Sequence, residues 1–152
     1  MILENSCQNS VYLETIRSDI PDEYELPLSW VSDWKATLEH IAFEIYTECS
    51  SPNWDGYNAL PMKTYAINWV ASLIGLLPLE VTPPDIVPEN TGDIGLEWRI
   101  GNTKIMTLSV VDGKLIYAAI LGEHDKRHGE EPFNVYELPE QIKKILLKHF
   151  RQ

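Results

Sequence analysis

The segment from Gly122 to Glu131 contains the densest group of residues that can bind metals or transfer protons. Its imidazole and carboxylate groups belong to His124, Asp125, His128, Glu130 and Glu131. Such groups act as metal ligands and as general acids or bases. However, a spacing of four aligns two ligands only on a helix, and glycines bracket this segment between two predicted strands. We therefore expect a solvated hairpin loop, with a metal or catalytic site and a partner contact as alternatives.

A second polar stretch, SSPNWDGYNALPM over residues 50–62, lies between two segments with helical periodicity. Pro52 is suited to end the first helix, and Asp55-Gly56 has the composition of a turn. The rings of Trp54 and Tyr57 are expected to fix this corner to the core. In the alternative interpretation, Asp55, Tyr57 and Asn58 project into a ligand pocket.

The sequence lacks other catalytic signatures. Its eight glycines form neither a G-x-G-x-x-G nor a Walker pattern, and no G-x-S-x-G string occurs. Cys7 and Cys49 have no metal-ligand spacing and form no disulfide framework, so we expect reduced thiols. The sequence therefore predicts no cofactor and favours a protein that is not an enzyme.

The chain is acidic, with a formal net charge of −11 at pH 7. Residues 1–60 contain 11 acidic residues but only Arg17 and Lys35 as bases, whereas residues 138–152 contain four bases and the single acid Glu140. Nucleic acids and anionic membranes are normally bound by clustered Lys and Arg, so we expect neither as a direct partner. The charge favours a basic protein partner, although solubility alone is an alternative explanation.

Residues 29–78 are expected to form a helical layer that follows an irregular lead-in over residues 1–28. The first helix begins at Ser29, a plausible N-cap, and its apolar residues recur every three or four positions. These are Trp30, Trp34, Leu38, Ile41, Ile45 and Cys49. A second helix ends at Pro78. Pro139 starts a third helix over residues 139–151, which buries Ile142, Ile145, Leu146 and His149.

Residues 84–138 change to a period of two, which predicts an antiparallel sheet. Gly101-Asn102 and Asp112-Gly113 fit two-residue hairpin turns between three strands. A fourth strand is expected at PFNVYEL, residues 132–138, and prolines limit residues 85–88 to an edge strand. The sequence thus predicts a single α+β domain, residues 1–152. Two N-terminal helices and a C-terminal helix pack on an antiparallel meander of about four strands.

The string Asn53-Trp54-Asp55-Gly56-Tyr57, with Ala59 and Pro61 after it, resembles an NWDGY-x-A-x-P stretch of small bacterial and phage proteins. The strings DIGLEW, DGKLIYA and LPEQI are similar to later parts of the same proteins, in the same order. The resemblance covers roughly residues 50–145. It implies a shared α+β fold and carries no activity.

These observations favour a small acidic interaction protein of the antitoxin, immunity or inhibitor type, located in the cytoplasm. Candidate contacts to its basic partner are Asp33, Glu44, Glu48, Asp55, Tyr57, His124, Asp125 and His128. The second hypothesis is an enzyme or ligand-binding domain whose pocket between helices and sheet is lined by Asp55, Tyr57, His124 and His128. In that case, the two histidines are the candidate metal ligands. A subunit of a larger assembly is the third hypothesis.

Overall fold

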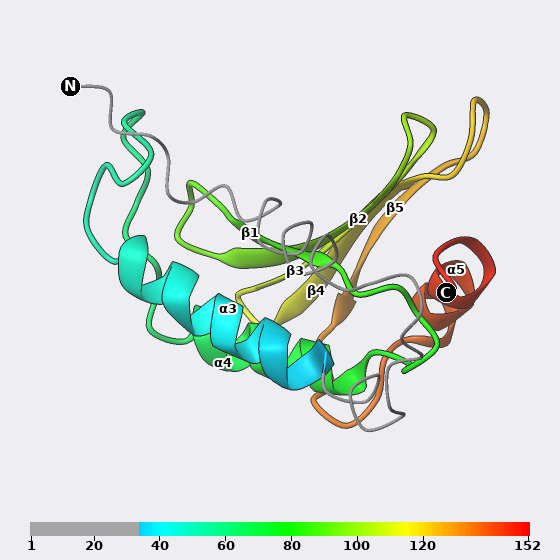
Figure 1. Ribbon diagram of the computed structural model, residues 1–152, viewed down its shortest axis with the longest axis horizontal. Coiled ribbons are helices and arrows are strands. Elements are labelled where there is room, and N and C mark those ends of the chain that lie inside the picture. Colours follow the sequence, from blue (N-terminus) through cyan, green and yellow to red (C-terminus); the bar gives the residue numbers. More distant parts are fainter. Residues whose placement is uncertain (1–33) are drawn as a thin grey trace, which may run out of the picture.

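A computed structural model describes residues 34–152 (Figure 1). The predicted lead-in over residues 1–28, the predicted helix start at Ser29 and the candidate Asp33 lie outside the described residues. The described chain has the predicted α+β architecture, with helices α3 (Trp34–Glu48), α4 (Ala66–Leu76) and α5 (Glu140–His149). Its five strands are β1 (Asp85–Pro88), β2 (Ile94–Ile100), β3 (Lys104–Val111), β4 (Lys114–Ile120) and β5 (Lys126–Pro132).

The strands form one antiparallel meander in the order β1-β2-β3-β4-β5. The turn between β3 and β4 is the predicted two-residue turn, and both of its residues have positive φ, 50° at Asp112 and 76° at Gly113. The connection between β2 and β3 is one residue longer than predicted, because it includes Thr103 after Gly101-Asn102. The predicted edge strand at residues 85–88 is confirmed as β1.

The last strand is not where the sequence placed it. The predicted loop over residues 122–131 contains all of β5 except Pro132, and β5 pairs with β4 from Ile120↔Lys126 to Lys114↔Pro132. Only residues 121–125 form the connection, closed by a bond from Leu121 N–H to the Asp125 carbonyl. The sheet therefore has five strands rather than about four. The predicted strand at residues 132–138 is wrong: beyond Pro132, the chain turns at Asn134, whose side chain accepts a hydrogen bond from Tyr136 N–H.

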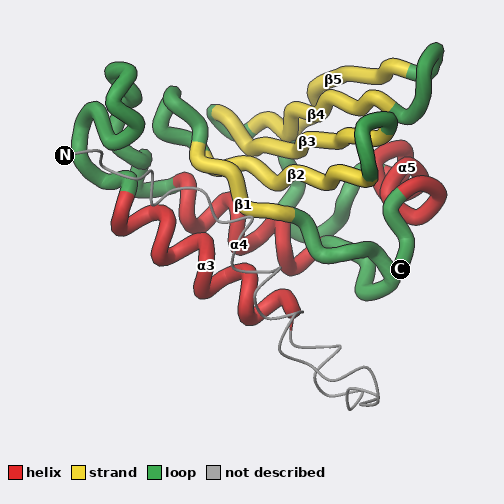
Figure 2. The backbone as a smooth tube through the Cα atoms, turned by 45° about the horizontal axis from the view of Figure 1, so that its top comes forward, coloured by secondary structure: helices red, strands yellow, loops and turns green. Residues whose placement is uncertain are grey.

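The helices α3 and α4 lie together against one face of the sheet (Figure 2). Alternate side chains of each central strand enter this interface, as a period of two requires. In β2 to β4 they are Ile94, Leu96, Trp98, Met106, Leu108, Val110, Leu115, Tyr117 and Ala119. The predicted apolar face of α3 is confirmed by the burial of Leu38, Ile41 and Ile45. We call the sheet face on the helix side the inner face and the opposite one the outer face.

The helix α5 closes one end of the sheet (Figure 1). Ile142, Ile145 and Leu146 are buried as predicted, and the Phe150 ring packs 6.4 Å from that of Trp98. After α5, Phe150 and Gln152 exchange backbone hydrogen bonds with the segment at residues 80–82. Among residues 34–152, no helix has both the length and the apolar composition required to cross a membrane.

Candidate functional site

The corner at residues 50–62 uses its polar side chains to hold its own backbone. The Asp55 carboxylate accepts hydrogen bonds from the N–H groups of Tyr57 (2.7 Å) and Ala59 (3.0 Å). Asn53 accepts one from Asn58 N–H at 2.7 Å. These bonds stabilise a loop with three residues at positive φ, namely Asn53, Gly56 and Asn58. Asp55 therefore serves the loop and does not project into a pocket.

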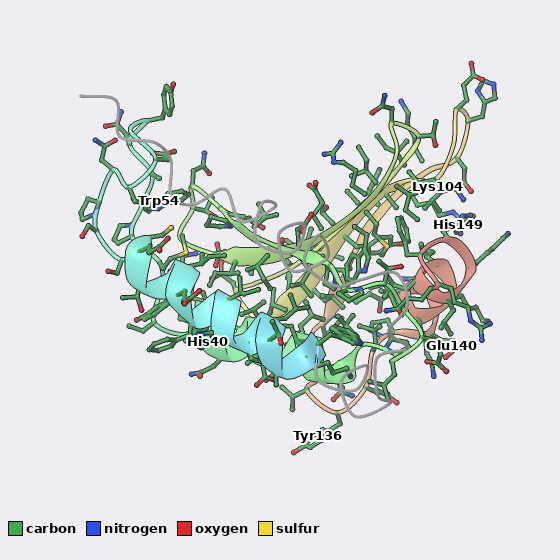
Figure 3. The ribbon with its side chains drawn as sticks, viewed as in Figure 1. His40, Trp54, Lys104, Tyr136, Glu140 and His149 are labelled. Atoms are coloured by element: carbon green, nitrogen blue, oxygen red, sulfur yellow. The ribbon has the colours of Figure 1, made fainter. Side chains whose placement is uncertain are left out.

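Trp54 joins the corner to the core, as the sequence predicted. Its ring is half-buried against the core, and its indole N–H donates to the Leu60 carbonyl at 2.9 Å (Figure 3). The expectation that the Tyr57 ring also fixes the corner to the core is wrong, because 84% of the Tyr57 surface is exposed. The corner is thus a rigid loop that presents one aromatic side chain to solvent.

A nearly buried ion pair attaches the corner to the turn between β1 and β2. Lys63 Nζ lies 2.9 and 3.2 Å from the two Asp93 carboxylate oxygens, and Asp93 is only 1% exposed. Its carboxylate also accepts a hydrogen bond from the Thr91 hydroxyl. The hydrogen bond to Asp93 raises the pKa of Lys63 above its ordinary value. Backbone bonds from Leu60 to Asn90 and from Lys63 to Gly92 complete the attachment.

The candidates at the other polar segment lie on the surface. His124 and Asp125 belong to the connection between β4 and β5, and His128 lies within β5 on the outer face, opposite Ala118. The Asp125 carboxylate accepts two hydrogen bonds from the Arg127 guanidinium, at 2.8 and 2.9 Å, and these bonds lower the pKa of the carboxyl group. Within residues 34–152, no group of three or more His, Cys, Asp or Glu side chains is arranged to hold a metal ion.

The structure does not bring Asp55 and Tyr57 together with His124 and His128. The corner and the β4–β5 connection lie at opposite ends of the sheet in two different views (Figures 1 and 2). These four side chains therefore do not line one pocket between helices and sheet.

The exposed face of α3 is the acidic surface closest to the corner. Glu44 and Glu48 are exposed, and His40 contacts Glu44 at 3.4 Å. Phe43, one position before Glu44, also points to solvent and is 58% exposed. Sequence reasoning missed Phe43, although one signal was present: a large apolar residue outside the apolar stripe of an amphipathic helix. We call His40, Phe43, Glu44 and Glu48 the α3 surface; Figure 3 labels His40.

The basic residues gather at the opposite end, around α5. His149 is half-buried there, as its place on the predicted inner side of α5 suggested. Burial lowers its pKa, and the nearby charges of Lys104, Lys148 and Arg127 lower it further, whereas Asp125 acts in the opposite direction. Figure 3 places Lys104 and His149 beside each other. Within residues 34–152, the acidic residues at the end of α3 and the basic residues around α5 therefore lie at opposite ends of the sheet (Figure 1).

Comparisons with known proteins assign no family to the chain. No family model matches it, and no significant match was found among curated proteins or solved structures. The resemblance based on the NWDGY string therefore stays a prediction.

Proposed function

We propose that this chain is a small, acidic, cytoplasmic interaction protein of the antitoxin, immunity or inhibitor type. It binds a basic protein through the α3 surface, without enzymatic activity and without direct contact to nucleic acid. The observation that carries the proposal is Phe43, an aromatic side chain that is 58% exposed on the solvent-facing side of α3, where Glu44 and Glu48 are also exposed.

Each part of this surface has a separate physical role in binding. Carboxylates attract a basic partner over a range set by the ionic strength and increase the association rate. An aromatic residue supplies contact area that is removed from water, and aromatic residues are enriched among those that dominate interface energy. Phe43 would thus provide affinity, while Glu44 and Glu48 would select the charge of the partner.

Tyr57 extends this surface beyond the end of α3. The corner follows α3 directly in the chain, and Figure 1 shows its loop projecting from that end of the helix. Because the loop is held by Asp55 and Asn53, Tyr57 would lose little conformational entropy on binding. The proposed contact therefore includes two exposed aromatic rings with carboxylates near the first.

The test is capture of the partner by the immobilised full chain, with the product of the neighbouring gene examined first. We expect a basic protein whose binding weakens as salt is added. Glu44→Lys with Glu48→Lys should reduce its affinity at least about tenfold, because two attractions become repulsions. Phe43→Ala should reduce affinity without changing the salt dependence.

The matched control is Glu123→Lys with Glu137→Lys, which makes the same charge change at two exposed positions away from α3. This control should bind like the wild type. Equal loss in both double variants would mean that only net charge matters and would contradict the α3 surface. An acidic partner, or binding insensitive to salt, would contradict the proposed function itself.

A further inference from the structure

We infer that β5 is a homodimer interface, at which two copies of this chain pair their β5 strands antiparallel into one continuous sheet. The partner is a second copy because the charges of β5 complement themselves. The interface lies at the sheet edge away from α3, so it is separate from the proposed partner surface (Figure 2).

The two edge strands of the sheet differ in how accessible they are to pairing with another strand. β1 has only four residues, ends in Pro88 and is contacted by α3. Such short, proline-containing and covered edges resist pairing. β5 has seven residues, and no strand among residues 34–152 pairs with its outer edge. Its backbone N–H and C=O groups on that side remain available to another strand.

The strand β5 carries its charges in a self-complementary order. Bases occupy its first half, Lys126, Arg127 and His128, and acids occupy its second half, Glu130 and Glu131. An antiparallel second copy places the first half of one strand opposite the second half of the other. Antiparallel pairing of two copies of β5 can therefore place basic residues opposite acidic ones.

Symmetry then selects the register. A two-fold axis perpendicular to the sheet keeps inner faces together, so a residue can oppose only residues of its own face. With Gly129 on the axis, Arg127 opposes Glu131 of the second copy on the inner face. His128 opposes Glu130 of the second copy on the outer face. Each pair occurs twice, and like charges do not meet.

The neighbouring registers are less favourable. Moving the axis to His128 sets this residue against itself, leaves Arg127 opposite Gly129 and keeps only Lys126 opposite Glu130 as an opposite-charge pair. Moving it to Glu130 sets two carboxylates against each other, which is destabilising. Gly129 also suits the axis sterically, because it has no side chain, and on the inner face it is overlain by the Tyr117 ring of β4.

Contacts within one copy do not prevent this pairing. Arg127 binds Asp125, Glu130 binds Lys114 at 2.9 Å, and Glu131 accepts a hydrogen bond from Gln141. All three are surface contacts, which contribute little to stability and exchange readily with solvent or other partners. A carboxylate also has acceptor sites for more than one donor.

The experiment is analytical ultracentrifugation of the full chain over a concentration series. We expect a reversible dimer that weakens as salt is added. Arg127→Glu and Glu131→Arg should each weaken self-association about a hundredfold, because the two-fold axis turns two attractions into repulsions. Mixing the two single variants should restore a dimer, since every Glu then faces an Arg. Circular dichroism of each variant confirms that it is folded.

A chain that stays monomeric at near-millimolar concentration would overturn the inference. A dimer that both variants leave unchanged would also overturn it, because its interface would then lie elsewhere. Failure of the mixture to pair would show that β5 does not meet β5 in this register. None of these results affects capture of a basic partner by the α3 surface.

Discussion

The corner at residues 50–62 and the strand β5 look alike in the sequence but have opposite roles in the structure. Both are polar, both contain glycine, and both carry acids next to hydrogen-bond donors. In the corner, the side chains of Asn53 and Asp55 bind backbone groups of the same loop. In β5, the charged side chains extend along an exposed sheet edge. The role of a polar side chain therefore depends on whether nearby backbone N–H groups need it as a hydrogen-bond acceptor.

The difference has a physical origin in backbone hydrogen bonding. An irregular loop leaves N–H groups unpaired, and side-chain oxygens satisfy them. A strand is paired along one edge by its neighbour, so its side chains are not needed for that purpose. Substitutions in the corner should consequently affect stability, whereas substitutions in β5 should affect association.

Gly92→Ala should give the largest loss of stability, about 4 kcal/mol. Gly92 has φ of 85°, and an added Cβ would lie 2.5 Å from the Pro61 carbonyl oxygen, a backbone atom that cannot move easily. The control is Gly129→Ala in β5, where the added atom would meet the Tyr117 side chain, which can shift. We expect about 1 kcal/mol there. Urea unfolding of both variants measures the difference, and equal losses would contradict the comparison.

Lys63→Met should cost about 3 kcal/mol, because it leaves the buried Asp93 carboxylate without its cation. Its counterpart in the other region is Lys114→Met, which removes the pair with Glu130. Both members of that pair are more than half exposed, so we expect a change below about 0.5 kcal/mol. Thermal unfolding distinguishes the two, and a small effect at Lys63 would show that water reaches Asp93.

Asp55→Ala should cost about 2 kcal/mol, since two backbone N–H groups lose a charged acceptor. Asp125→Ala is the matched change beside β5, where the carboxylate binds only the exposed side chain of Arg127 among the bonds described. No measurable change in stability is expected there. If Asp55→Ala leaves stability intact but abolishes partner binding, the corner is a binding site rather than a structural element.

The smallest effect concerns pH and His149, at the basic end of the sheet. Its pKa is lowered in the folded state from an ordinary value of 6.5. As the pH falls below that value, the unfolded chain takes up a proton that the folded chain resists, so stability decreases. At pH values above 6.5, His149 contributes no pH dependence to the free energy of unfolding. His149→Gln should remove this part of the acid sensitivity. The measurement is urea unfolding at a pH above 6.5 and at a pH about one unit below 6.5.

Sequence periodicity predicted the elements whose faces differ in burial. The apolar stripe of α3 and the alternation in β2 were readable because one side of each meets the core. β5 escaped prediction because exposure on both faces removes any alternation. Residues 132–138 were misread as a strand, since Phe133 owes its burial to the Trp69 ring, 5.4 Å away, rather than to a sheet.

The candidate site was predictable only in part. The acids Glu44 and Glu48 followed from charge and helical spacing, whereas Phe43 became notable only once its exposure was known. The separation of Asp55 from His128 could not be derived from their positions in the chain. It depends on which end of the sheet each connection occupies (Figure 1).

By itself, the sequence determined the α+β class, the acidic charge, the helix periods and the Asp112-Gly113 turn, because each depends on residues close together in the chain. Only the tertiary structure decided that Lys63 meets Asp93, that β5 is an open edge, and that the corner is held by its own side chains. These features depend on contacts between distant segments and on which backbone groups remain unpaired after the chain has folded.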